Sequence, residues 1–168
     1  KQVQALIDEI DRNPILTDKE KQALKDRINQ ILQQGHNDIN NAMTKEEIEQ
    51  AKAQLGQALQ DIKDLVKAKE SAKQDIDKQV QALIDEIDRN PILTDKEKQA
   101  LKDRINQILQ QGHNGINNAM TKEEIEQAKA QLGQALQDIK DLVKAKESAK
   151  QDIDKQVQAL IDEIDRNP

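Results

Sequence analysis

Residues 45–90 read KEEIEQAKAQLGQALQDIKDLVKAKESAKQDIDKQVQALIDEIDRN, and this stretch decides the fold. It contains no Pro and a single Gly, Gly56, and its apolar residues recur every three or four positions from Ile48 to Ile87. Such spacing places apolar side chains on one face of an α-helix. The stretch therefore predicts one unbroken helix, about 69 Å long at 1.5 Å per residue.

This helix joins two copies of one repeat. Residues 1–77 recur as residues 78–154 with a single difference, and the chain then starts a third copy. We divide it into helical repeat 1 (1–77), helical repeat 2 (78–154) and the truncated start of repeat 3 (155–168). Near-identical tandem copies indicate one supersecondary unit stacked end to end. Because the third copy stops after a few residues, we interpret the chain as a piece of a longer array.

Two shorter helices precede the long one in each repeat. The first is predicted over residues 1–12 and is ended by Asn13 and the proline after it, with Asn13 as a left-handed cap. The second begins after Thr17, which forms a capping box with Glu20. Its apolar stripe stays in phase as far as about residue 42, so we expect a continuous helix there.

The start of the long helix and two glycines carry further predictions. Thr44 and Glu47 form a second capping box, and Met43 is placed to form a hydrophobic staple with the residue four positions into the helix. Gly35 lies on the apolar stripe of the second helix, where it either admits a close neighbour or kinks the helix. Gly56 is predicted to mark another close helix contact.

The expected fold is all-α, with tandem three-helix bundles that share a continuous inter-repeat helix in a spectrin-like elongated rod. Residues 67–75 contain only two apolar side chains, both Ala, so they are predicted to carry little packing. A Pro at Lys73 should then leave both bundle cores, centred on Leu55 and Leu132, intact. Gly115 replaces a predicted solvent-facing Asp38 and should weaken the second copy slightly.

Composition narrows the class of protein. The chain has no Phe, Tyr, Trp or Cys, 35% of its residues are charged, and its formal net charge is −6. Nucleic acids and anionic membrane surfaces are disfavoured, because both require a basic face. No apolar run approaches the ~18 residues of a membrane span. Disorder, which a charged chain without aromatics permits, is disfavoured by the regular apolar spacing.

Side chains that could carry chemistry are few. His36 and His113 have no Cys or second His at metal-ligand spacing, so both are interpreted as surface histidines. Ser71 and Ser148 have no histidine base near them in sequence. An acidic cluster recurs once per repeat, but it lies on a helix and not on a calcium-binding loop. Its members are Asp8, Glu9 and Asp11, with copies Asp85, Glu86 and Asp88. We therefore expect no catalytic, cofactor-binding or metal-binding residue, no cofactor and no enzyme activity.

Protein binding is the serious alternative to a purely structural role. Tight interfaces usually rely on buried aromatic and Arg anchors. Here aromatics are absent, and each repeat has only two arginines, Arg12 and Arg27 in the first. We therefore expect a monomer whose partners are its neighbouring repeats, with no small-molecule substrate and no tight binding of albumin, immunoglobulin or DNA.

One motif resembles a known family. Residues 10–21 read IDRNPILTDKEK and residues 39–44 read INNAMT. This pattern resembles the helical stalk repeats of staphylococcal wall-anchored surface proteins, which are catalogued as a domain of unknown function. The resemblance spans both copies, and its motifs are caps and stops that carry no catalytic or ligand residue. It implies a secreted protein, anchored to the Gram-positive cell wall, whose repeats hold an adhesive region away from the cell.

The leading functional hypothesis is a structural stalk of a bacterial adhesin, in which the number of copies sets the length. An array that itself binds host protein, or that self-associates in cell aggregation and biofilm, is the alternative. A cytosolic coiled-coil scaffold is a third class. It is disfavoured because helix caps every few turns favour bundles within one chain over long zippers.

Overall fold

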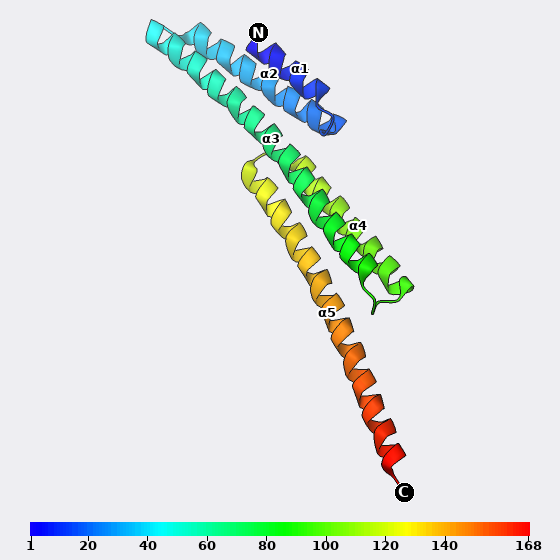
Figure 1. Cartoon of the computed structure of the whole chain (residues 1–168). Coiled ribbons are helices and arrows are strands. Elements are labelled where there is room, and N and C mark those ends of the chain that lie inside the picture. The colour runs from blue at the N-terminus through cyan, green and yellow to red at the C-terminus, as the bar shows by residue number, and fades with distance from the viewer. The chain divides into compact units, whose positions relative to one another are not determined.

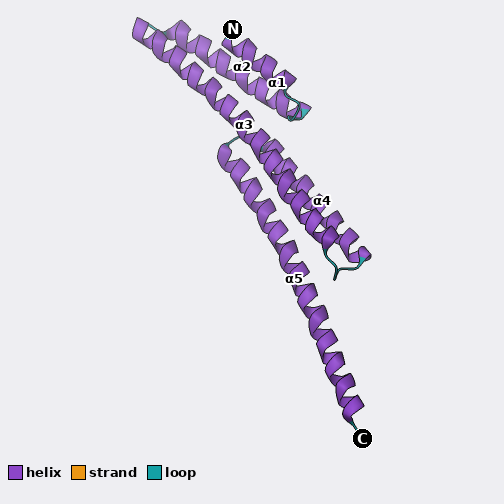
Figure 2. Ribbon diagram, viewed as in Figure 1, coloured by secondary structure: helices purple, strands orange, loops and turns teal.

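The computed structural model describes residues 1–168 and consists of five α-helices without strands (Figures 1 and 2). Helical residues make up 89% of the chain, which confirms the all-α prediction. The helices are α1 (Gln2–Arg12), α2 (Asp18–Asn41), α3 (Lys45–Arg89), α4 (Asp95–Asn118) and α5 (Lys122–Arg166). None of them combines the length and the apolar composition that crossing a membrane requires.

The long helix is confirmed as a single element. α3 has 45 residues and runs without interruption from one repeat into the next, and α5 repeats it with the same length. Its start is held by the predicted capping box, in which Thr44 Oγ1 accepts from the Glu47 amide at 3.0 Å. The Glu47 carboxylate accepts in turn from the Thr44 amide at 3.2 Å. Met43 is 88% exposed, so the predicted hydrophobic staple is wrong.

Asn13 ends α1, but its backbone conformation differs from the predicted one. The Thr17–Glu20 capping box that opens α2 is present as predicted. Asn13, however, has φ −71° and ψ 122°, so the left-handed cap is wrong and the residue is extended. Its side-chain oxygen accepts from the amides of Ile15 and Leu16 at 2.8 and 3.1 Å. This short-range bonding turns the chain without requiring a left-handed backbone.

The chain divides into two compact units whose boundaries differ from those of the repeats. Unit 1 consists of Lys1–Asp75 together with His113–Ala128, and unit 2 consists of Ile76–Gly112 together with Lys129–Pro168. A segment of repeat 2 therefore packs within unit 1. Each core is aliphatic. The buried side chains of unit 1 include Leu6, Ile10, Leu24, Ile28, Ile62, Leu65 and Ile116, and those of unit 2 include Ile76, Val80, Leu83, Ile87, Ile105, Leu132 and Ile139.

The prediction that residues 67–75 carry little packing is wrong. Within unit 1, Lys69, Ala72 and Lys73 are all buried. The two lysines occupy positions on the apolar stripe, and the carboxylate of Glu20 accepts hydrogen bonds from both ammonium groups. A Pro at Lys73 would therefore disturb unit 1 and not only the continuity of α3.

Gly35 lies in the close contact that its place on the stripe suggested. α2 is continuous across it, so the helix is not broken there. A Cβ at Gly35 would lie 2.5 Å from Cδ1 of Leu55, and one at Gly112 would lie 2.5 Å from Cδ1 of Leu132. These glycines let a leucine from the facing helix pack against the backbone.

Gly56 does not mark a close helix contact, and that prediction is wrong. A Cβ at Gly56, or at its copy Gly133, would meet no atom within 4 Å apart from the adjoining residues and backbone of its own helix. Gly in a helix interior is less favourable than Ala by about 0.5–1 kcal/mol. We expect Gly56→Ala and Gly133→Ala each to raise the free energy of unfolding by about that amount, as measured by urea denaturation. Gly35→Ala is the control, and its free energy of unfolding should increase less, because the side chain of Leu55 has to move. An equal increase at all three positions would contradict this prediction.

Gly115, the only difference between the copies, lies at a close approach inside unit 1. A Cβ there would come within 3.0 Å of the Cβ of Ala128. The corresponding Asp38 is half-buried and accepts a hydrogen bond from Gln34 at 3.0 Å. Restoring Asp at position 115 would therefore improve helix propensity but tighten the contact with Ala128. The solvent-facing position that the sequence suggested for this site is not what the structure shows.

Candidate functional site

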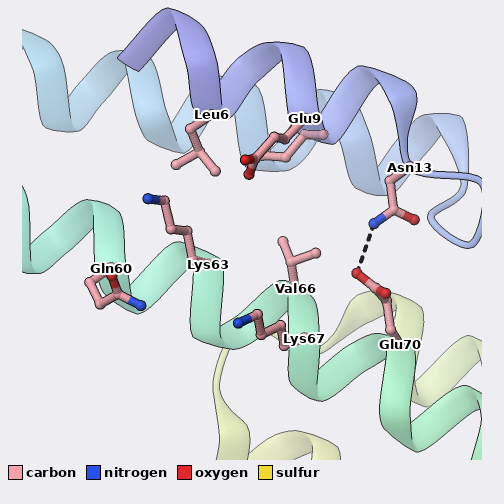
Figure 3. Close-up of a pocket in the computed structure, with 9 residues that line it drawn as sticks. Leu6, Glu9, Asn13, Gln60, Lys63, Val66, Lys67 and Glu70 are labelled. Atoms are coloured by element: carbon pink, nitrogen blue, oxygen red, sulfur yellow. Dashed lines mark hydrogen bonds between the residues drawn. The ribbon is translucent and has the colours of Figure 1, made fainter. Parts of the chain in front are cut away.

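A groove lies between α1 and α3 in unit 1, and Figure 3 shows the side chains that line it. Leu6, Ile10 and Val66 form its apolar floor. Charged and polar side chains surround them: Glu9, Asn13, Gln60, Lys63, Lys67 and Glu70. We call this set the α1–α3 groove. It offers both signs of charge over a small apolar floor and no aromatic anchor.

Asn13 organises one end of the α1–α3 groove. Its side-chain oxygen holds the turn after α1, while its Nδ2 donates to Oε1 of Glu70 at 2.8 Å (Figure 3). One side chain thus fixes both the chain direction after α1 and the position of α1 against α3. This explains in physical terms why the Asn-Pro pair matters beyond stopping a helix.

The groove recurs in unit 2 with the same residue types. Its lining there is Leu83, Glu86, Ile87, Asn90, Lys140, Val143, Lys144 and Glu147. Nδ2 of Asn90 donates to Oε1 of Glu147 at 2.8 Å, as in unit 1. A surface that recurs once per repeat is the arrangement that multivalent binding would use.

A second feature is buried in unit 1. Nζ of Lys69 donates to Oε2 of Glu20 at 3.0 Å, and Nζ of Lys73 donates to Oε1 of the same carboxylate at 2.7 Å. These three residues, which we call the charge cluster, are only 2–5% exposed. Two ammonium groups thus share one carboxylate away from water. Glu20 also keeps its capping bond, because its Oε1 accepts from the Thr17 amide at 2.9 Å.

Lys69 also bonds to a segment of repeat 2. Its Nζ donates to the carbonyl oxygens of Ile116 and Asn117 at 3.0 and 2.8 Å. Both carbonyls belong to the last turn of α4, where helix carbonyls have no intrahelical partner and cations are favourable. Arg27 adds a bond of 3.2 Å from Nη1 to the carbonyl oxygen of Met120. Unit 1 therefore contains a polar contact between the two repeats.

The corresponding residues in unit 2 are more open. Glu97 accepts from Lys146 at 2.9 Å and from Lys150 at 2.6 Å, so the ion pairs are retained. The two lysine side chains are 37% and 36% exposed, against 2% and 6% for Lys69 and Lys73. The same three residues are therefore buried in one unit and half-exposed in the other.

These environments shift the acidities of the groups. The hydrogen bond from Lys150, followed by those from the Thr94 amide and Lys146, lowers the pKa of Glu97 from 4.5 to about 2. Burial opposes ionisation of Glu20, but the bonds from Lys73, the Thr17 amide and Lys69 together still lower its pKa. Burial lowers the pKa of Lys69, and the bond to Glu20 opposes that shift.

Acid should therefore destabilise the fold. A carboxylate whose pKa falls on folding contributes stability that is fully present above its unfolded pKa and is lost as the pH falls through its folded pKa. For Glu97 that window runs from pH 4.5 to about pH 2. We expect the melting temperature, followed by circular dichroism, to drop across this window. Glu97→Gln keeps an acceptor for the cap and should make the melting temperature of unit 2 depend less on pH in this window. A plot of melting temperature against pH that runs parallel to the parent's would contradict this prediction.

The residues that the sequence offered for chemistry are dispersed. His36 is exposed, His113 is half-buried, and Ser71 and Ser148 are exposed. Glu9 belongs to the rim of the α1–α3 groove, while Asp11 accepts from Nζ of Lys25 at 2.8 Å. No group of three or more His, Cys, Asp or Glu side chains is arranged to hold a metal ion.

Sequence reasoning missed the charge cluster. The signal was present, because Lys69 and Lys73 continue the three- and four-residue spacing that leads from Leu65 to Ile76. Charged residues at stripe positions normally interrupt an apolar face. Their partner, Glu20, is far away in sequence and already had a role in the capping box, so nothing local indicated the pairing.

Comparison with known proteins gives one family. The model of the Domain of Unknown Function (DUF1542) matches residues 1–67 and 68–144. The two matches end 77 residues apart, which is the period of the internal repeat. No solved structure matches the chain.

Curated relatives are similar over the whole of this chain. It is 92% identical to the extracellular matrix-binding protein EbhA of Staphylococcus aureus strain Mu3 and 90% identical to EbhA of strain Newman. It covers 2% and 5% of those proteins, respectively. Neither the family match nor these names indicate an enzyme. The motif resemblance by itself suggests SasC, FmtB and Ebh as staphylococcal proteins of this type, with SasC first among them. The comparisons support Ebh and do not show SasC or FmtB.

Proposed function

Because the chain belongs to the family of the Domain of Unknown Function (DUF1542), we propose that it is a structural spacer segment of a staphylococcal surface adhesin. Its relatives are named as extracellular matrix-binding proteins, and the chain spans about 2% of the length of most of them. In this proposal the protein is secreted and anchored to the cell wall, and the repeats 1–77, 78–154 and 155–168 set a distance. They form a spectrin-like elongated rod that projects a distal adhesive region and carry no catalytic, cofactor or metal site.

The observation that carries the proposal is that consecutive repeats share a helix and are joined by hydrogen bonds. α3 is a single uninterrupted helix, and its residues contribute to both units. Within unit 1, the ammonium group of Lys69 holds the last carbonyls of α4, which belongs to repeat 2. A spacer needs neighbouring copies that are joined by more than a flexible linker, and both features serve that need.

A series of copy numbers tests the spacer proposal. Proteins with one, two and three 77-residue copies should show a maximum dimension, measured by small-angle X-ray scattering, that increases by the same increment with each copy. Flexibly linked repeats would show smaller increments as copies are added. Equal dimensions for two and three copies would overturn the proposal.

The recurring α1–α3 groove supports a second candidate, in which the repeats themselves bind matrix protein. Lys67 and Lys144 are exposed on the rims of the two grooves and are copies of one another. If the grooves bind, Lys67→Glu with Lys144→Glu should reduce retention on an immobilised extracellular-matrix preparation at least tenfold. Lys78→Glu with Lys155→Glu makes the same charge change at exposed positions outside the grooves and should have no effect. Absence of retention of the parent protein would favour the spacer.

A further inference from the structure

The single difference between the two copies changes the chemistry of the asparagine before it. Residues 113–116 read HNGI, whereas the corresponding residues 36–39 read HNDI. Asn114–Gly115 is the only Asn-Gly pair in the chain. The backbone nitrogen that follows an asparagine can attack the side-chain amide carbon, and glycine, which has no Cβ, hinders that attack least. Repeat 2 therefore contains a reactive dipeptide that repeat 1 lacks.

The pair lies near the end of α4, in a segment that packs within unit 1. Residues 113–128 belong to unit 1, and Asn114 is exposed there, whereas Ile116 is fully buried. The two residues after Gly115 supply the carbonyl oxygens that accept hydrogen bonds from the buried ammonium group of Lys69. A covalent change at Asn114 would therefore occur beside a buried contact, although the asparagine itself is open to water.

The helix opposes this reaction as long as it is intact. α4 continues through both residues to Asn118. In an α-helix the amide of Gly115 donates to the carbonyl oxygen four residues earlier, so its nitrogen is not available for attack. Ring closure also requires a ψ at Asn114 far from the helical value of about −42°. The pair can therefore react only when the last turn of α4 opens locally.

We propose that Asn114 is a deamidation site whose reaction requires the last turn of α4 to open. The backbone nitrogen of Gly115 forms a bond to Cγ of Asn114, and a five-membered succinimide results. The side-chain nitrogen of Asn114 takes up the proton of the Gly115 amide and leaves as ammonia. Water then opens the ring at either carbonyl carbon and leaves aspartate or isoaspartate. The reaction consumes one water, releases one ammonia and requires no enzyme, oxidant or cofactor.

The product weakens the contact that protected the asparagine. Isoaspartate adds one carbon to the main chain, so the carbonyls of Ile116 and Asn117 lose the helical spacing that directs both of them to Lys69. Either product also adds a negative charge about one turn from the end of α4, where a negative charge is unfavourable. Opening permits deamidation and deamidation favours opening, so residues 113–118 loosen irreversibly with time. This inference does not depend on the spacer proposal.

Two measurements on the whole chain test the dependence on opening. Peptide mass spectrometry during incubation at mildly alkaline pH gives the deamidation rate of Asn114, and hydrogen exchange gives the protection of the Gly115 amide. An unstructured peptide of residues 109–118 gives the rate without a helix, and a peptide of residues 32–41 should react at least tenfold more slowly. In the whole chain, Asn114 should react more slowly than in its peptide, by about the factor that protects the Gly115 amide from exchange.

Variants at the contact with α4 should change the rate in a fixed order. Lys69→Met removes the hydrogen bonds to both carbonyls and should speed deamidation at least tenfold. Arg27→Gln removes only the bond to the carbonyl oxygen of Met120, so its effect should be smaller, and this exposed bond is not needed for folding. Lys146→Met is the matched control, because Lys146 donates to Glu97 at the other end of α4, and the variant should react like the parent.

The effect of the product is measured on the separated deamidated protein. Its amides at residues 116–118 should exchange at least tenfold faster than those of the parent. Asn114→Gln, which cannot form the five-membered ring, should keep the parent's exchange rates throughout the same incubation. An Asn114 that stays intact while the peptide reacts completely, a rate equal to that of the peptide, a Lys69→Met variant that reacts like the parent, or deamidated protein with the parent's exchange rates would each overturn the proposal.

Discussion

Replacing Glu20 by Ala should lower the free energy of unfolding of unit 1 by about 3–5 kcal/mol. The loss arises because Lys69 and Lys73 are buried and both form their direct ion pair with Glu20. Without it, two ammonium groups remain away from water with only backbone carbonyls to receive their hydrogen bonds. Removing one member of a buried ion pair costs far more than removing an exposed pair, because the remaining charge is left desolvated.

The chain contains its own control for this prediction. Glu97→Ala removes the same residue type, and it also breaks a capping box and two lysine ion pairs. In unit 2, however, the two lysines, Lys146 and Lys150, are more than a third exposed. The capping contribution is equal in both variants and cancels in the comparison. Hydrogen exchange of the α2 amides in the first variant and of the α4 amides in the second would measure each loss. Equal losses in the two variants would show that burial of the lysines is not the cause.

Replacing Lys73 by Pro should destabilise the core of unit 1 by at least about 3 kcal/mol. The sequence predicts instead that both bundle cores stay intact. A Pro inside a helix removes a backbone hydrogen bond and clashes with the carbonyl four residues earlier. Here that residue is Lys69, so the clash falls on another member of the charge cluster. The variant also loses the Nζ bonds of Lys73 to Glu20 and to the carbonyl oxygen of Ile15. Circular dichroism during urea denaturation would record the loss.

Lys150→Pro is the matched variant in repeat 2. It breaks the same turn of the same helical sequence, but from residue 151 onward every residue of α5 is exposed. Fraying of that end therefore costs few packing contacts. We expect its midpoint to stay much closer to the parent's than that of Lys73→Pro. If the two variants lost equal stability, the charge cluster would not stabilise unit 1, and the original prediction about residues 67–75 would be restored.

Local signals in the sequence predicted the helices well. Thr17 with Glu20 and Thr44 with Glu47 identify helix starts, because a side chain that satisfies a free amide acts within a few residues. The absence of Pro and of turn clusters between residues 45 and 89 was enough to predict α3 as one element. The predicted role of Asn13 as a stop was also correct, although its backbone conformation was not.

Predictions about packing were less accurate, and each error has the same origin. The sequence allows a close helix contact at Gly35 and predicts one at Gly56, but only Gly35 faces a leucine of the neighbouring helix. Met43 has the spacing of a staple but is exposed. The α1–α3 groove combines residues about 57 positions apart, such as Asn13 and Glu70. Which helix face meets which neighbour depends on how the helices cross, and the local pattern does not encode that crossing.

The sequence by itself determined the number of helices, their limits and the 77-residue period, because capping, helix propensity and apolar spacing act over a few residues. Only the tertiary structure decided that residue 20 lies against residues 69 and 73, and that the same three residue types are buried in one unit and half-exposed in the other. Two copies with nearly identical sequences differ in this way because burial depends on which neighbouring segment covers a residue. That neighbour, and the desolvation it imposes on a charge, belongs to the assembled fold and not to the residue.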